Sequence, residues 1–108
     1  MELKLVKMYR HGEDDSMAHL SIEASYGYGG KMCSDIIQIN YNGKKREAFI
    51  AARVLNPGAG AVIERMIEAI TTVDYAAPKV KNPPLLMLEV LAERLNLRYD
   101  SDEAARAL

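Results

Sequence analysis

The sequence predicts an α+β fold: an antiparallel four-stranded sheet made of two hairpins, two helices packed on one of its faces, and a short C-terminal helix. Apolar and polar residues alternate through most of the first half of the chain, which is typical of strands. Apolar residues then recur at helical spacing along two later stretches. Between two of the strand-like runs lies Asn42-Gly43, the strongest short signal for a hairpin turn. We expect residues 1–108 to form a single domain.

The first hairpin is predicted from residues 2–10 and 17–26, which a polar turn connects. In the first strand, strict alternation places Leu5 and Tyr9 on the same face of the sheet. The other side of this strand is also partly apolar, so we expect it to be covered on both faces. In the second strand, His19 points away from the core, where exposure to solvent is the default expectation for a histidine.

The second hairpin is predicted from residues 35–41 and 48–55. A two-residue turn between these strands would place Ile37 opposite Ala48. In this register the core face carries Ile37, Ile39, Ala48, Ile50, Ala52 and Val54. The opposite face carries Ile36, Gln38, Asn40, Lys45, Glu47, Phe49 and Arg53. Ile36 and Phe49 would form an apolar island on this second face.

Three helices are predicted from apolar spacing and from residues suited to their first turns. Asn56 suits the N-cap of a helix over residues 57–74, which continues with a proline at its first position. Asn82 suits the N-cap of a second helix, which has two prolines in its first turn. Asp100, with a glutamate three residues later, predicts a short last helix over residues 101–108.

The stretch where the last strand turns into the first helix suggests a binding site. Backbone N–H groups at a helix N-terminus attract anions, and glycines in the first turn leave these groups uncovered. The predicted ligand-binding residues are Gly58, Ala59 and Gly60 for the anion, Arg53 and Lys31 as its counter-charges, and Tyr26 and Tyr28 as a lid. Ala61-Val62 stands where a P-loop requires Lys-Ser/Thr, so nucleotide hydrolysis is not predicted. The alternative is structural: the glycines let the helix start pack closely on the sheet, and the tyrosines cover an edge of the core.

No residue is predicted to be catalytic, and no metal or other cofactor is expected. Cys33 is the only cysteine, so a thiolate zinc cluster is excluded. His11 lies beside acidic residues, but their spacing matches neither a calcium loop nor a zinc site. No serine lies in a nucleophile elbow. The sequence therefore predicts a protein that is not an enzyme.

The formal net charge of −1 disfavours nucleic acid as a partner, because proteins that coat phosphates are usually markedly basic. No apolar run approaches the roughly 18 residues that are needed to cross a bilayer, so no membrane partner is expected. The single cysteine and the absence of a leader-like start fit a reducing compartment. The expected location is the cytoplasm, or the cytoplasm of an infected host.

Association is the function that the sequence favours. Four strands and two helices are too few to cover both faces of the sheet, so Ile36, Gln38 and Phe49 are predicted to form an interface. A homodimer or a higher homo-oligomer would cover them most simply. The first hypothesis is a small, non-enzymatic, self-associating binding module that sequesters a phosphate-bearing ligand such as a nucleotide. The alternative is a small protein inhibitor or adaptor, of the kind that phages and mobile elements encode, which docks through the Phe49 face.

Overall fold

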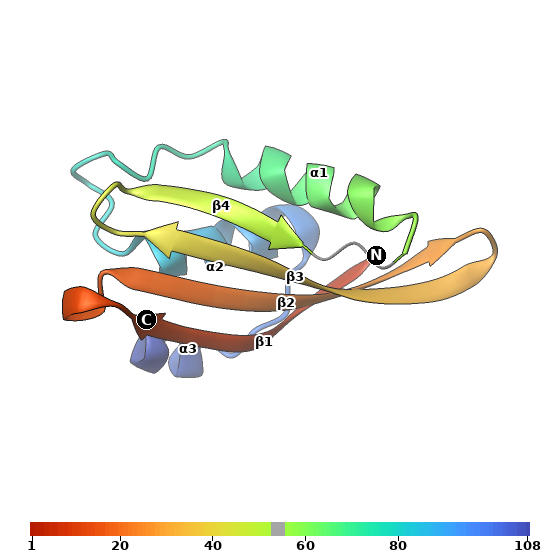
Figure 1. Cartoon of the computed structure of the whole chain (residues 1–108), viewed down its shortest axis with the longest axis horizontal. Helices are drawn as coiled ribbons and strands as arrows, with labels where there is room; N and C mark the ends of the chain where they lie inside the picture. Colours follow the sequence, from red (N-terminus) through yellow and green to blue (C-terminus); the bar gives the residue numbers. More distant parts are fainter. Residues whose placement is uncertain (53–55) are drawn as a thin grey trace.

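A four-stranded antiparallel sheet forms the centre of the fold, with its strands in the order β1-β2-β3-β4 (Figure 1). The computed structural model describes residues 1–52 and 56–108. The strands are β1 (Glu2–His11), β2 (Met17–Tyr28), β3 (Lys31–Asn42) and β4 (Glu47–Ala52). The helices are α1 (Ala59–Ile70), α2 (Pro83–Leu95) and α3 (Ser101–Ala107), and a short 3-10 turn, η1 (Glu13–Asp15), lies between β1 and β2. The predicted α+β class is therefore confirmed.

The β2–β3 hairpin is longer than predicted and projects beyond the helices (Figure 1). The turn needs only Gly29 and Gly30, whose φ angles of 60° and 78° suit a tight hairpin turn. Tyr28 and Lys31 are therefore already paired across the turn, although the predicted strands stop at residue 26 and resume at residue 35. The hairpin makes the molecule elongated, with extents of 45 × 24 × 23 Å.

The β3–β4 hairpin has the predicted faces but a different register. Ile37 lies opposite Ala52, and Ile39 lies opposite Ile50, so the predicted pairing of Ile37 with Ala48 is wrong. The partner of Ile37 stands four residues further along the chain than predicted. Side chains alternate with a period of two, so this even shift leaves each described residue of the two strands on its predicted face, whereas Arg53 and Val54 lie outside the described residues.

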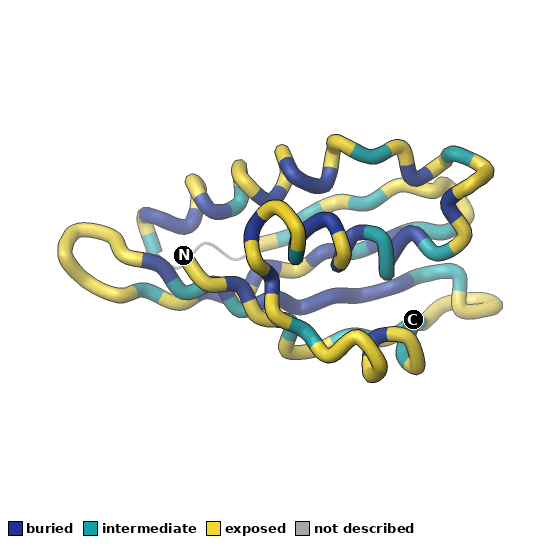
Figure 2. The backbone as a smooth tube through the Cα atoms, turned by 180° about the vertical axis from the view of Figure 1, so that it is seen from behind, coloured by how far each residue is buried: buried dark blue, intermediate teal, exposed yellow. Residues whose placement is uncertain are grey.

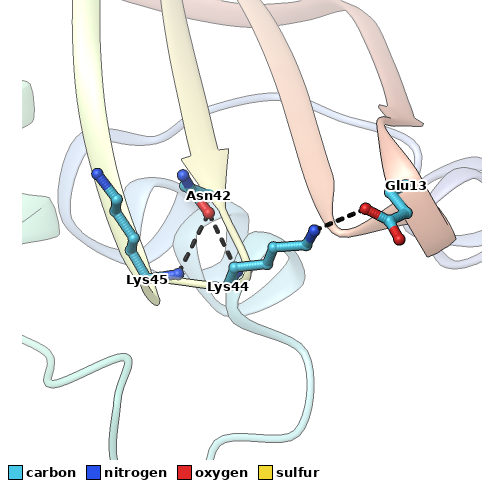
Figure 3. Close-up of polar contacts among 4 residues, drawn as sticks. All are labelled: Glu13, Asn42, Lys44 and Lys45. Carbon is cyan, nitrogen blue, oxygen red and sulfur yellow. Dashed lines mark hydrogen bonds and ion pairs between the residues drawn. The ribbon is translucent and has the colours of Figure 1, made fainter.

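The turn between β3 and β4 explains the shift, because it begins one residue later than predicted and has four residues instead of two. Asn42 Oδ1 accepts hydrogen bonds from the backbone N–H groups of Lys44 and Lys45, at 3.0 and 3.2 Å, and thereby closes a wider turn (Figure 3). Arg46 ends the turn with a φ of 54° and donates hydrogen bonds to the carbonyl oxygens of Tyr75 and Val80. The side chains of the turn thus select the register.

The first turns of the helices differ in how they are capped. Asn82 Oδ1 accepts from the N–H of Leu85 at the start of α2, and Asp100 caps α3, both as predicted. In contrast, α1 begins at Ala59 after Gly58 and has no side-chain cap, so the prediction of Asn56 as N-cap is wrong. Asn56 Nδ2 instead donates hydrogen bonds to the carbonyl of Ser34 and to the carboxylate of Asp35 on β3.

One hydrophobic core lies between the sheet and the two longer helices (Figure 2). Its members include Leu20, Ile22, Ile37 and Ile39 from the sheet, Val62, Met66 and Ile70 from α1, and Met87, Leu88 and Leu91 from α2. Each such side chain stabilises the fold by about 1.5–3 kcal/mol relative to an exposed position. Because the sheet contributes residues of one face only, α1 and α2 lie on that face.

A β-bulge in β1 changes which side chains of that strand reach the core. Before the bulge, Leu5 lies opposite Ile22 on the core face. The register then shifts between Leu5 and Lys7, and Val6 is the extra residue. Tyr9 consequently lies opposite His19 on the other face, so the prediction that Leu5 and Tyr9 share a face is wrong.

The two edges of the sheet are covered to different extents. Along β1, the N–H of Leu5 donates to the carbonyl of Arg98, and the N–H of Arg98 donates to the carbonyl of Leu3, at 3.0 and 2.9 Å. Helix α3 lies beside the same strand, where Arg10 Nε donates to the carbonyl of Leu108 at 2.9 Å (Figure 1). The other edge is the short strand β4.

Candidate functional site

The face of the sheet opposite the core carries no helix among the described residues, and we call it the open face. Its side chains are Lys7, Tyr9 and His11 from β1, His19, Ser21 and Glu23 from β2, Ile36, Gln38 and Asn40 from β3, and Glu47, Phe49 and Ala51 from β4. Tyr9, His19, Asn40 and Phe49 form one row across the four strands, each directly opposite the next. The row therefore places two aromatic rings at opposite edges of the sheet.

The imidazole of His19 is fixed at the centre of this row. With Asn40 Oδ1 as acceptor, His19 Nδ1 donates at 3.0 Å, and Nε2 then accepts from the hydroxyl of Ser21 at 2.7 Å. The ring of Tyr9 stacks on the imidazole, with centroids 5.0 Å apart and planes inclined by 25°. Only 9% of His19 is exposed, so the prediction of a solvated histidine is wrong.

A hydroxyl, an imidazole and an amide in this order also form the nucleophile, base and orienting group of some acyl-transfer enzymes. Such enzymes additionally need hydrogen-bond donors aimed at the oxyanion of the transition state. On β2, an inner strand, the backbone N–H groups are used in pairing with β1 and β3. Ser21 is also buried, with 6% of its surface exposed. The network therefore fits a rigid platform better than a catalytic relay.

The open face carries large exposed apolar side chains. Phe49 is 55% exposed and Ile36 is 44% exposed. Ile36 and Gln38 line a hollow of about 620 Å³ on this face. Phe49 also lines a second hollow of about 220 Å³ at the edge of β4, together with Ile67 of α1. The residues predicted for the interface, Ile36, Gln38 and Phe49, thus lie on the same face of the sheet. Phe49 lies opposite Asn40, however, four residues along β3 from Ile36, so the predicted apolar island of Ile36 and Phe49 is wrong.

The start of α1 is packed against the β2–β3 hairpin. A Cβ atom added at Gly58 would lie 2.8 Å from ring atoms of both Tyr26 and Tyr28. The structure therefore brings Gly58 and the two tyrosines together, as both interpretations of this stretch require. Ala59 is buried, whereas Gly60 is exposed and a Cβ there would meet nothing within 4 Å.

Of the two charged residues predicted to pair with the anion, the structure describes only Lys31. Lys31 is exposed at the start of β3, beyond the body of the sheet. Arg53 lies outside the described residues, so its predicted role stays a prediction. At the other end of the sheet, Lys44 Nζ pairs with the carboxylate of Glu13 at 3.0 Å, between two exposed side chains (Figure 3).

A buried carboxylate lies next to the start of α1. Asp35 is 4% exposed and accepts a short hydrogen bond from the hydroxyl of Tyr26. Asn56 Nδ2 donates to both oxygens of this carboxylate, at 3.1 Å, and the carbonyl of Asn56 accepts from the N–H of Ala59. An acidic residue is thus already tied to the segment that enters α1, which weakens the case for an external anion at this position.

Two buried phenols predict a loss of stability at alkaline pH. Burial, reinforced by the hydrogen bond to Asp35, raises the pKa of Tyr26 to about 12, and burial alone raises the pKa of Tyr75 to about 12. These values lie above the ordinary 10.0, so both groups favour the folded state below pH 10, and this stabilisation is lost as the pH rises toward 12. We expect the denaturant midpoint, followed by circular dichroism, to fall over this range.

Phenylalanine variants test the assignment of this alkaline effect. The fall should become shallower in Tyr26→Phe and in Tyr75→Phe, because each variant removes a buried group that ionises. The matched control is Tyr28→Phe, since Tyr28 is 51% exposed. A midpoint that stays constant between pH 10 and 12 in the parent protein would show that the two phenols are not the source of the effect.

Sequence reasoning placed Tyr9 on the wrong face, and it placed His19 and Asn40 away from the core without joining them into one network. The bulge at Val6 conceals Tyr9, because strict alternation assigns that residue to the core face. The signal for the other two was present: His19 and Asn40 alternate with core residues on strands that were themselves predicted. Pairing the two predicted hairpins with each other would have placed His19 opposite Asn40.

Other kinds of site can be assessed for residues 1–52 and 56–108, which the structure describes. No group of three or more His, Cys, Asp or Glu side chains among them could hold a metal ion. None of the helices that they form is long and apolar enough to cross a membrane. Comparison with protein-family models, with curated proteins and with solved structures gives no match, so the open face and the start of α1 are the basis for any functional proposal.

Proposed function

We propose that this chain is a non-enzymatic binding module that self-associates through its open face. The observation that supports the proposal is the exposure of Tyr9, Ile36 and Phe49, at 41%, 44% and 55%, on a sheet face without a helix. A face of this kind is typical of protein contacts. Burying a side chain such as Phe49 stabilises a complex by up to about 1.5–3 kcal/mol, which gives an interface its driving force.

The hydrogen-bonded network on the open face supports the same proposal. Because His19 is hydrogen-bonded to both Asn40 and Ser21, covering the network with a partner would leave neither nitrogen of the imidazole unpaired. The face is also held in shape before binding, which lowers the entropy that association costs. A second copy of the chain is the simplest partner, since a two-fold contact needs only one self-complementary surface.

The alternative proposal assigns the open face to a different protein, on which the chain would dock as a small inhibitor or adaptor. A phosphate-bearing ligand at the start of α1 is a separate proposal. It is supported by the half-exposed ring of Tyr28, which lies against Gly58 as a lid would. It is opposed by the buried carboxylate of Asp35. The self-associating module accounts for more of the exposed apolar surface.

The substitution Phe49→Asp tests self-association. The parent protein is expected to have about twice the 12.0 kDa mass of one chain by native mass spectrometry and sedimentation equilibrium. Phe49→Asp should have the mass of a monomer with an unchanged far-ultraviolet circular dichroism spectrum. The aspartate would be buried without a partner in the interface, whereas it is hydrated on the free monomer.

The matched control is Tyr28→Asp, because Tyr28 is an aromatic residue of similar exposure, at 51%, that lies outside the open-face row. This variant should remain a dimer. If Phe49→Asp also remains a dimer, the contact lies elsewhere on the molecule. If the parent protein is a monomer, self-association is wrong and the docking alternative gains weight.

A further inference from the structure

The hairpin of β3 and β4 contains an Asn-Gly pair, Asn42-Gly43, and the fold uses both residues. Asn42 Oδ1 accepts from the backbone N–H groups of Lys44 and Lys45 and closes the turn (Figure 3). Gly43 lies directly against the residue that follows η1, because a Cβ atom at this position would overlap the carbonyl of Ser16. A side chain at position 43 therefore does not fit, and the structure itself brings an asparagine and a glycine together in the sequence.

An Asn-Gly pair can react with itself. The backbone nitrogen of the glycine attacks Cγ of the asparagine side chain, and the absence of a Cβ lets these two atoms approach closely. A peptide nitrogen becomes nucleophilic only after it has given up its proton to a base such as hydroxide. Two features therefore control the reaction here, namely the hydrogen bonds of Asn42 Oδ1 and those of the Gly43 N–H group.

The side chain of Asn42 is held in a way that favours the reaction. Its Oδ1 accepts from two backbone N–H groups, at 3.0 and 3.2 Å. Negative charge develops on this oxygen when Cγ is attacked, and donors that are already in place stabilise such a charge, as they do in an oxyanion hole. Asn42 is also partly exposed, so water and hydroxide reach the turn.

The nitrogen of Gly43 is held in a way that opposes the reaction. Its N–H donates to the carbonyl of Ser16 at 2.7 Å, and a carbonyl oxygen is too weak a base to take the proton. The position of Ser16 depends on η1, whose three residues are exposed and include Asp14 and Asp15 with φ angles of 55° and 53°. An exposed turn with left-handed residues opens more readily than the sheet beside it.

We propose that Asn42 is a deamidation site, which the Gly43–Ser16 hydrogen bond keeps latent until it opens. The nitrogen of Gly43 then loses its proton to hydroxide and forms a bond to Cγ of Asn42. The bond from Cγ to Nδ2 breaks, and ammonia leaves with a proton from water, so that a cyclic imide remains. Water adds to one of the two carbonyls of the imide and opens the ring, which leaves aspartate or isoaspartate at position 42.

The two products affect the hairpin differently. Aspartate keeps a side-chain oxygen for the N–H groups of the turn. Isoaspartate carries the main chain through the former side chain, and this lengthens the backbone by one carbon atom before Gly43. Asn42 pairs with Met17 on β2 and with Glu47 on β4. We therefore expect isoaspartate to disturb the register at this end of the sheet, independently of the proposed function.

Ageing of the protein at mildly alkaline pH tests the proposal. The peptide that contains residue 42 is followed by mass spectrometry, which detects the exchange of an amide for an acid. Asn42 should react at least about ten-fold more slowly in the folded protein than in the same protein unfolded in urea, because the Gly43–Ser16 bond is closed most of the time. Equal rates would overturn the proposal.

Gly12→Ala should open this bond selectively. Gly12 has φ 80° and ψ −178°, which only glycine adopts freely, and a Cβ there would lie 2.8 Å from Cγ of Met17. The strain falls on η1, so the deamidation rate should rise by about five-fold or more in protein that circular dichroism shows to be folded. An unchanged rate in Gly12→Ala would contradict the proposal.

The matched control is Gly58→Val, which strains the fold at the far end of β2, where a Cβ would lie 2.8 Å from ring atoms of Tyr26 and Tyr28. This variant leaves η1 intact, so its rate at Asn42 should stay within about two-fold of the parent rate. If both variants accelerate the reaction equally, deamidation follows unfolding of the whole chain, and the Gly43–Ser16 bond has no role.

Hydrogen exchange measures the same bond in the parent protein and needs no variant that folds. The N–H of Gly43 should exchange with deuterium at least about ten-fold more slowly in the folded protein than in urea, since its hydrogen is bonded to the carbonyl of Ser16. An N–H that exchanges as fast in the folded as in the unfolded chain would show that the nitrogen is not restrained, and the proposal would be wrong.

Discussion

Asp35→Ala is expected to lower the free energy of unfolding by about 2–3 kcal/mol, one of the two largest effects that we predict for a single side chain. Asp35 is 4% exposed and is the acceptor for the hydroxyl of Tyr26 and for the amide of Asn56. Its removal leaves the hydroxyl of the buried Tyr26 without an acceptor, and it leaves Asn56 Nδ2 with only its bond to the carbonyl of Ser34. Urea denaturation, followed by circular dichroism, measures the change.

A double-mutant cycle with Tyr26→Phe shows whether the loss comes from this network. In the background of Tyr26→Phe, Asp35→Ala should cost at least about 1 kcal/mol less, because one of the two donors is already absent. Strictly additive effects would mean that the carboxylate and the hydroxyl do not interact. Lys79→Ala is a suitable control for substitution by alanine, since Lys79 is exposed.

Gly58→Val is expected to destabilise the protein by about 1–3 kcal/mol through steric overlap. A Cβ at this position would lie 2.8 Å from ring atoms of both Tyr26 and Tyr28. Tyr28 can move aside, because it is half exposed, but Tyr26 is buried and its hydroxyl is bonded to Asp35. The backbone of Gly58 has φ −79° and ψ −7°, which any residue adopts, so the cost is one of space and not of backbone strain.

The neighbouring glycine provides the matched control. Gly60 lies in α1 with nothing within 4 Å of its missing Cβ, so Gly60→Ala should raise stability by about 0.5–1 kcal/mol through helix propensity. Equal effects of Gly58→Val and Gly60→Ala on the denaturation midpoint would contradict the packing account. Because Gly58→Val perturbs the fold, Gly60→Val is the better variant for testing whether a nucleotide stabilises the protein at this helix start.

The fold was predictable where the spacing of apolar residues and the N-cap residues of the helices determine it. Alternation identified all four strands and the faces of β2, β3 and β4, and Asn82 and Asp100 marked the starts of two helices. The register of the last hairpin was not predictable from Asn42-Gly43, because the side chain of Asn42 closes a longer turn instead. Asn56 failed as a cap because a distant residue, Asp35, binds its amide group.

The candidate site was predictable in part for the same reasons. Ile36, Gln38 and Phe49 lie on one face because the faces of β3 and β4 depend only on parity, which survived the error in register, whereas that error placed Phe49 beside Ile36 and the structure places it beside Asn40. Tyr9 depended on a bulge that leaves no mark in the sequence around Val6. The roles of Gly58, Tyr26 and Tyr28 could be proposed from sequence, but their close contact arises from the unpredicted length of the β2–β3 hairpin.

That projecting hairpin also affects how the protein behaves in a chromatography column. The radius of gyration is 13.7 Å, against about 13 Å for a compact chain of this length. Much of the excess lies along one direction, where the molecule extends 45 Å against 24 and 23 Å in the others. An elongated molecule meets more friction in solution than a sphere of the same mass. A single chain therefore diffuses as slowly as a somewhat heavier sphere. A mass derived from its elution volume alone would therefore be too high, and a direct measurement of mass avoids this error.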